Sequence, residues 1–314
     1  IGVNSAVNSM NVGNFAGGTN GNNILLVKNG TGTFALTGAN SFSGKTTVLG
    51  GVLSLGHSSA LSQSPLDTQN SITGTSTAGL RTTVTTLTLG GLTGNKDFAS
   101  VFETATGGYS TLTALTLNPV SGATHSYSGN VGDGAGNMTL TKTGAGTQIL
   151  SGTNTYTGAT LVSAGTLFVT GSLTSDVTVS DGATVGGGGT VDDISFGGGS
   201  FFDIALSVDG SPNPLDSAGT ISFTAAGFGI DNLVSGGIPV NWSSIADGTY
   251  TLITGTLNSS NLDNFGLANA YDIGSGRRAY FQNGSLQLVV IPEPSAALLG
   301  AFGLIALIRR RRTN

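Results

Sequence analysis

The chain has 314 residues, of which only 9% are charged and 52 are glycine, whereas about a quarter of the residues of an ordinary soluble domain are charged. The net charge is −5, and residues 1–308 carry 7 basic against 16 acidic side chains. This balance excludes a basic surface for phosphate contacts, so we expect no nucleic-acid partner. Cysteine is absent, which excludes disulfides, thiolate-bound zinc and thiol catalysis. Strong helix formers are scarce before the apolar C-terminal stretch, which predicts an all-β body.

Residues 1–24 are rich in Asn and Gly and predict a fraying first turn of the coil or a terminal cap, and a clear pattern begins at Lys28. Residues 28–55 contain short segments in which apolar and polar side chains alternate, separated by Gly- and Asn-rich turns, which is typical of short strands. The same pattern returns at 142–169, an offset of 114, with 12 of the 28 aligned positions identical. Gly, Asn, Thr, Lys28/Lys142 and alternating apolar residues recur, but acids and histidines do not. The repeat therefore indicates scaffold geometry.

The segments between and after the two copies also predict short strands separated by breaks. Residues 57–80 are polar and contain Pro65, which predicts a surface loop or irregular strands, and residues 85–91 and 112–117 predict clear strands. Very short strands with Gly-rich breaks follow in 177–191. Such spacing favours a β-solenoid with roughly 20–25 residues in each rung, that is, each turn of the coil, and an offset of 114 then spans several rungs. A pair of β-sandwiches is the alternative.

Large aromatic side chains appear after residue 199, and the strand spacing becomes irregular. We therefore expect a glycine-rich solenoid over 1–199 and a β-rich capping region over 200–290, because the open end of a solenoid must be covered.

The C-terminal tail, residues 291–314, differs from the rest of the chain. Residues 291–295 have the sequence IPEPS, residues 296–308 lack a polar side chain, and four arginines follow, Arg309, Arg310, Arg311 and Arg312. Because proline suits the first turn of a helix, a short hydrophobic helix is predicted directly after Pro294. This apolar stretch is short for a membrane span, although snorkelling arginines and local thinning help. We expect residues 296–308 to engage the inner membrane transiently, with the arginines as the cytoplasmic stop.

This tail resembles a PEP-CTERM sorting signal, which has a Pro-Glu-Pro motif, an apolar helix and a basic cluster. Ile291 stands where that family usually has Val. The resemblance implies that Pro292, Glu293, Pro294 and Ser295 form the processing motif for an exosortase-type enzyme in a Gram-negative bacterium.

The body resembles the autotransporter-associated β-strand repeat proteins through the pattern GxGTxxLxGxNxxxGxTxV, found in both copies. Residues 172–199 are similar to a degenerate continuation of this pattern. The resemblance implies a right-handed parallel β-helix at the cell surface.

We searched the sequence for catalytic and metal-binding chemistry as well. Asp192, Asp193 and Asp203 are the nearest approach to a catalytic acid group, but adjacent strand residues point to opposite faces. His57 and His125 lie in polar contexts and are expected at the surface. Gly186–Gly189, followed by Asp192, is an imperfect copy of a calcium-binding roll repeat. We therefore expect no catalytic residues, metal or cofactor.

The sequence thus predicts an exported structural or adhesin-like protein of the cell surface or extracellular matrix. Its polar Thr, Asn and Ser ladders offer contacts to extracellular polysaccharide. A polysaccharide-degrading or polysaccharide-binding β-helix protein is the alternative.

Overall fold

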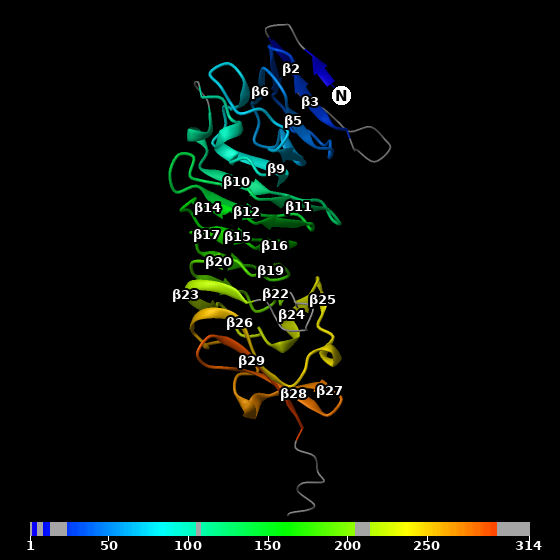
Figure 1. Ribbon diagram of the computed structural model, residues 1–314, viewed down its shortest axis with the longest axis vertical. Helices are drawn as coiled ribbons and strands as arrows, with labels where there is room; N and C mark the ends of the chain where they lie inside the picture. Colours follow the sequence, from blue (N-terminus) through cyan, green and yellow to red (C-terminus); the bar gives the residue numbers. More distant parts are fainter. Residues whose placement is uncertain (1, 5–8, 13–23, 105–107, 205–213, 294–314) are drawn as a thin grey trace, which may run out of the picture.

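The computed structural model describes residues 2–4, 9–12, 24–104, 108–204 and 214–293 of the chain. These residues form an elongated coil of short strands that stack in parallel from one end of the molecule to the other (Figure 1). We call each stack of paired strands a track. The architecture is all-β, since the only helices in the described ranges are short 3-10 turns. These turns are η1 (Phe98–Val101), η2 (Tyr109–Thr111), η3 (Ile230–Asn232), η4 (Trp242–Ser244) and η5 (Leu267–Asn269).

The first track runs the whole length of the coil, and each of its strands pairs in parallel with the next. Its members are β1 (Gly2–Asn4), β3 (Leu26–Asn29), β5 (Thr46–Val48), β7 (Leu61–Asp67), β9 (Thr86–Thr93), β10 (Ala114–Leu117), β12 (Thr139–Lys142), β15 (Thr160–Val162), β18 (Val177–Val179), β21 (Ile194–Phe196), β23 (Leu215–Phe223) and β26 (Gly248–Leu257).

The second track lies on another side of the coil and consists of two sheets. The N-terminal sheet contains β2 (Ser9–Val12), β4 (Thr33–Leu36), β6 (Val52–Leu55) and β8 (Gly79–Thr82). The other sheet contains β11 (Thr124–Tyr127), β13 (Thr147–Leu150), β16 (Thr166–Val169), β19 (Thr184–Gly186), β22 (Phe201–Asp203) and β24 (Leu233–Ser235), with β25 (Ile238–Pro239) antiparallel to β24. A short third track is made by β14 (Thr153–Asn154), β17 (Ser172–Leu173), β20 (Thr190–Val191) and the start of β23.

The rungs differ in length because the loops between tracks differ. The rung from Val177 to its partner Ile194 is short, whereas the rung from Leu87 to its partner Leu115 contains longer loops. The repeat offset carries the chain from β3 to β12 through β5, β7, β9 and β10, which is five pairing steps. The segment 57–80, for which a surface loop or irregular strands are predicted, contributes β7, with a buried Pro65 and a shift of register, and the start of β8.

The interior of the coil is filled by inward columns, which are rows of side chains at paired positions of successive strands. One column is apolar apart from a single lysine, and all of its members are buried: Leu89, Leu117, Lys142, Val162, Val179, Phe196 and Phe223. Such in-register stacking places the side chains of each rung on those of the rung before it, as expected of a solenoid.

Parallel stacking continues past residue 199, so the coil ends later than the sequence indicated. Ile194 pairs with Ile221 on β23, and Leu215 pairs with Ile253 on β26. Phe202, Phe223 and Phe228, three of the aromatic residues that suggested a cap, fill the interior of these wider rungs, and the ring centroids of Phe196 and Phe228 lie 4.9 Å apart.

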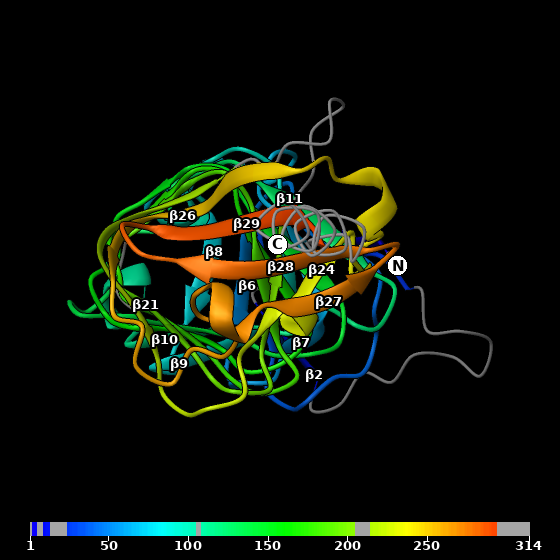
Figure 2. The same cartoon turned by 90° about the horizontal axis from the view of Figure 1, so that it is seen from below.

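The end of the coil is covered by antiparallel strands. β29 (Leu286–Pro292) pairs with β26 and with β28 (Arg277–Gln282), and β28 pairs with β27 (Tyr271–Gly274). These strands cross the end of the coil (Figure 2), which closes its exposed edge.

Candidate functional site

The three aspartates considered as catalytic candidates lie on different parts of the coil. Asp192 and Asp193 are exposed at the turn between β20 and β21, where an Asp193 carboxylate oxygen accepts the backbone N–H of Thr220. Asp203 lies on β22, in the second track, and is 1% exposed. The structure therefore does not bring these acids together, and the described residues contain no group of three His, Cys, Asp or Glu side chains that could hold a metal ion.

The glycine run at 186–189 allows successive rungs to pack closely. A Cβ atom on Gly187 would meet the carbonyl of Val169, and a Cβ atom on Gly189 would meet the carbonyl of Gly171. Only glycine allows such a close approach of one rung to the next.

The two histidines are half-buried, and neither is as exposed as expected. His57 Nδ1 accepts the N–H of Ser59 at 3.0 Å within its own turn. His125 lies on β11, where burial, with a smaller effect of Lys45, lowers its pKa below the usual value. His125 is therefore neutral at pH 7.

The recurring lysines, the recurring asparagines and the pair Thr46 and Thr160 point inward, whereas the recurring pair Thr33 and Thr147 lies on the outward face of β4 and β13. Lys28 Nζ donates to the carbonyls of Asn29, Gly30 and Gly50, each at 2.9 Å. Lys142 Nζ donates to the equivalent carbonyls of Thr143, Gly144 and Ala164 at 2.6, 2.9 and 3.0 Å. We call each lysine with its three carbonyls a lysine cage. Both lysines are 0% exposed, and burial lowers the pKa of both, to about 8 for Lys142.

Asparagine and threonine complete this internal scaffold. Asn40 and Asn154 are buried, and each donates to a carbonyl two residues earlier and to one in the next rung. Thr46 and Thr160 make buried hydroxyl contacts of 2.7 Å with Ser64 and Ser175. The repeated residues thus fix the stacking of the coil.

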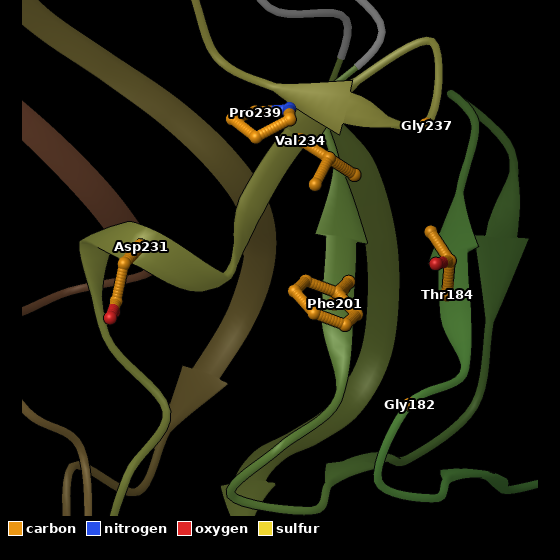
Figure 3. A pocket seen from close by; sticks show the side chains of 7 residues that line it. All are labelled: Gly182, Thr184, Phe201, Asp231, Val234, Gly237 and Pro239. Carbon is orange, nitrogen blue, oxygen red and sulfur yellow. The ribbon is translucent and has the colours of Figure 1, made fainter.

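A groove lies on the outside of the second track. Its volume is about 350 Å³, and the strands β19, β22, β24 and β25 together with η3 surround it (Figure 3). It is lined by Gly182, Thr184, Phe201, Asp231, Val234, Gly237 and Pro239. Phe201 lies between Thr184, its partner on β19, and Asp231. The groove therefore joins an aromatic ring to one carboxylate and one hydroxyl.

The wall of this groove is a tight hairpin held by Asp203. Val234 pairs with Pro239, and the two residues at the turn, Gly236 and Gly237, have φ of 61° and 76°. Positive φ at both central positions is typical of a two-residue hairpin turn. The carboxylate of Asp203 accepts the N–H of Gly236 at 3.2 Å and that of Gly237 at 3.0 Å. Asp203 is therefore an anchor of the hairpin.

Asp231 is placed by its neighbour Asn232. The Asn232 side chain accepts the N–H of Gly229 at 2.8 Å and donates to the carbonyls of Ser200 and Gly198. These contacts fix η3 on the end of β22. The Asp231 carboxylate itself is exposed and makes no hydrogen bond or ion pair with the described residues.

An outward column of threonines leads to the groove. Thr124, Thr147, Thr166 and Thr184 occupy paired positions on β11, β13, β16 and β19, and Phe201 takes the next position on β22. We call these four residues the threonine column. Their hydroxyls make no hydrogen bond within the described part of the chain.

The predicted tail is described only at its beginning. Ile291 and Pro292 belong to β29 and pair with Arg278 and Arg277, and the exposed Glu293 donates its N–H to the carbonyl of Gly276 at 2.7 Å. Pro294, Ser295, the apolar stretch 296–308 and Arg309–Arg312 lie outside the described residues. Within the described ranges, no helix has the length and apolar character needed to span a bilayer.

Comparison with known families supports the resemblance of the body. Residues 26–55 and 140–169 match the model of the passenger-associated-transport-repeat family. Both matched segments contain a lysine cage. No curated protein and no solved structure shows significant similarity to the chain. The two matches indicate a passenger of the autotransporter type, which is secreted or displayed at the cell surface.

Proposed function

We propose that the protein is an exported, non-catalytic structural protein with an adhesin-like role, displayed on the surface or in the extracellular matrix of a Gram-negative bacterium. The observation that carries this proposal is the continuous parallel coil with lysine cages in both passenger-type repeats. The recurring lysines, the recurring asparagines and the pair Thr46 and Thr160 form hydrogen bonds inside the scaffold, whereas the outward threonine column offers hydroxyls for contact. The coil is right-handed in this proposal, as parallel crossover connections generally are.

The tail directs the export in this proposal. Residues 296–308 form a short helix that anchors the chain transiently in the inner membrane, and Arg309–Arg312 stop it on the cytoplasmic side. An exosortase-type enzyme then processes the chain near Pro292–Ser295. Since Ile291 and Pro292 are held in β29, the last strand ends within the motif, and in this proposal cleavage near Ser295 leaves the pairing of β29 intact.

Mass spectrometry of the exported protein tests this route. Strains with and without the exosortase-type enzyme are compared, and antibody labelling of intact cells reports surface display. We expect a C-terminus near residue 295 only when the enzyme is present. A surface or secreted chain that still ends in Arg309–Arg312 and Thr313-Asn314 would contradict the sorting proposal.

Polysaccharide binding is the second candidate function, and the groove is the observation that favours it. Glycoside cleavage generally requires two carboxyl groups facing the same bond. Asp231 is the one acid among the residues that line the groove. This lining favours binding of a glycan over its cleavage.

A further inference from the structure

We propose that the groove at Phe201 and the threonine column form one binding site for a neutral polysaccharide. In this site the C–H face of one sugar ring lies on Phe201, and its hydroxyls donate to the Asp231 carboxylate and bond to Thr184. The inference deepens the proposed function, and it rests on that function only for the source of the glycan outside the cell.

The groove fits a sugar ring because its lining combines an apolar surface with polar side chains beside that surface. Phe201, Val234 and Pro239 supply apolar surface, and Asp231 and Thr184 lie on opposite sides of the Phe201 ring (Figure 3). A pyranose ring likewise has an apolar face and a rim of hydroxyls. Small-molecule sites typically combine such an apolar lining with a few convergent polar groups. A carboxylate acceptor makes the strongest of these hydrogen bonds.

Charge selects a neutral glycan. The groove is lined by one acid and no basic residue, and the Asp231 carboxylate has no partner within the described residues. A uronic acid or a phosphate would place a second negative charge near this carboxylate, and like charges in contact reduce affinity strongly. Neutral hexose units avoid this repulsion.

The site is rigid before the ligand arrives. Asp203 holds the hairpin through two backbone N–H groups, and Asn232 holds the turn that carries Asp231. Phe201 lies on a strand paired on both sides, with β19 and β24. Preorganisation of this kind reduces the entropy lost on binding.

The threonine column extends the site beyond one sugar. Neighbouring strands lie about 4.8 Å apart, so Thr124, Thr147, Thr166 and Thr184 form a straight row of hydroxyls that ends at the groove. A second half-buried aromatic residue, Phe168, faces outward on β16. Its ring reaches over Gly186, where a Cβ atom would come within 2.9 Å of it. A linear polysaccharide can therefore contact several rungs while one of its units occupies the groove.

The first track supplies an internal control. Thr88, Thr116, Thr141 and Thr178 also point outward with hydroxyls that make no hydrogen bond in the described part of the chain. Leu161 interrupts this second row, and no aromatic residue stands in it between Thr88 and Thr178. If free threonine hydroxyls alone bound glycans, both rows would do so equally.

Affinity electrophoresis of the purified 314-residue chain tests the site. Native gels contain dextran, galactomannan or a soluble β-glucan as neutral probes, or alginate as the acidic probe. We expect retardation by at least one neutral polymer and none by alginate. Phe201→Ala should weaken that binding at least tenfold, Phe201→Trp should keep it, and Thr178→Val on the first track should leave it unchanged.

Asp231→Asn tests the contribution of the negative charge to binding separately from that of the apolar contact with Phe201. This exposed substitution should weaken neutral-glycan binding about fivefold and reduce the discrimination against alginate. Circular dichroism and the midpoint of urea unfolding establish that each variant is folded. The proposal is overturned by absence of retardation in every neutral polymer, by preference for alginate, or by equal effects of Phe201→Ala and Thr178→Val. Because purified protein is used, these outcomes do not depend on sorting, and a failure of tail processing in cells leaves them unaffected.

Discussion

Replacing Lys142 with methionine tests whether the lysine cage holds the coil together. The change keeps most of the apolar stem but removes the ammonium group, so the carbonyls of Thr143, Gly144 and Ala164 lose their donor. The last of these carbonyls belongs to the turn of the next rung. The substitution should therefore loosen the contact between two successive rungs.

The expected change in the free energy of unfolding is the difference between two opposing effects. Hydrogen bonds to a charged group contribute about 1.5–3 kcal/mol each, so three of them contribute roughly 4–9 kcal/mol. Burial of the ammonium opposes this gain, and the fall of the Lys142 pKa from 10.5 to about 8 corresponds to roughly 3 kcal/mol. We therefore expect Lys142→Met to lower the free energy of unfolding by about 1–6 kcal/mol at pH 7.

The pH dependence has a definite sign. Between pH 8 and 10.5 the unfolded chain holds a proton on Lys142 that the folded chain has released, so the stability of the wild type rises with pH in this window. From pH 7 to pH 9.5 the Lys142 contribution should grow by about 2 kcal/mol. Lys142→Met lacks this gain. The comparison stays below pH 10 because the buried Tyr127 and Tyr156 have raised pKa values, which favour the unfolded state at higher pH.

Urea unfolding and hydrogen exchange measure the effect. A solenoid can lose its stability locally, so exchange is compared between peptides covering 140–169 and those covering 26–55, where the cage of Lys28 is intact. Lys45→Met is the matched control, because the Lys45 side chain is 51% exposed and the Asp67 carboxylate, 3.7 Å from Lys45 Nζ, keeps its two hydrogen bonds from Asn70, so the loss should be less than about 1 kcal/mol. The reasoning is refuted if Lys142→Met and Lys45→Met unfold at the same urea concentration, or if exchange rises equally in both repeats.

Three further predictions concern single contacts of the fold. Gly165→Ala should destabilise the chain by about 1–3 kcal/mol more than Gly182→Ala in thermal unfolding, because both residues have positive φ but only at Gly165 would a Cβ atom meet carbonyls of the preceding rung. Arg81→Met should cost about 3–5 kcal/mol, since it leaves the buried Glu103 carboxylate without its partner, and the double substitution with Glu103→Leu should recover much of that loss; a double variant as unstable as the single one would contradict this account. Asp203→Ala should release the Gly236–Gly237 turn, seen as faster exchange of these two N–H groups, while peptides in 140–169 stay protected.

The coil could be predicted from the sequence because its determinants are local. Alternation within β4 and β13 and the glycines at the turns already specify short strands and breaks. The same alternation places Lys28 on the face of Leu26, and Lys142 on the face of Leu140. This two-residue spacing from an inward leucine indicates that each lysine points inward. Charged residues are so rarely buried, however, that the spacing alone does not identify the lysines as interior residues.

The groove and the end of the coil could not be predicted, because they depend on pairings between distant residues. Phe201 and Phe202 are adjacent aromatics, and only the pairing of Phe202 with Leu233 determines which one points inward. Asp231 and Pro239 reach the groove because a long rung joins Phe202 to Leu233. The same long rungs made the aromatic residues after 199 resemble a cap, although Phe202, Phe223 and Phe228 fill the coil.

Most of the recurring polar residues stabilise the interior of the coil, whereas other polar residues form its outer surface. Lys28, Asn40 and Thr46 have equivalents in the second repeat, and all are buried. Their hydrogen bonds to carbonyls or hydroxyls of neighbouring rungs keep the strands in register. The threonine column and Asp231 point outward, and apart from Thr147, whose equivalent in the first repeat is Thr33, they do not belong to the repeated pattern. The outer surface of such a coil can therefore change from rung to rung while the interior keeps the stacking, which is the property that a displayed scaffold with a single binding groove requires.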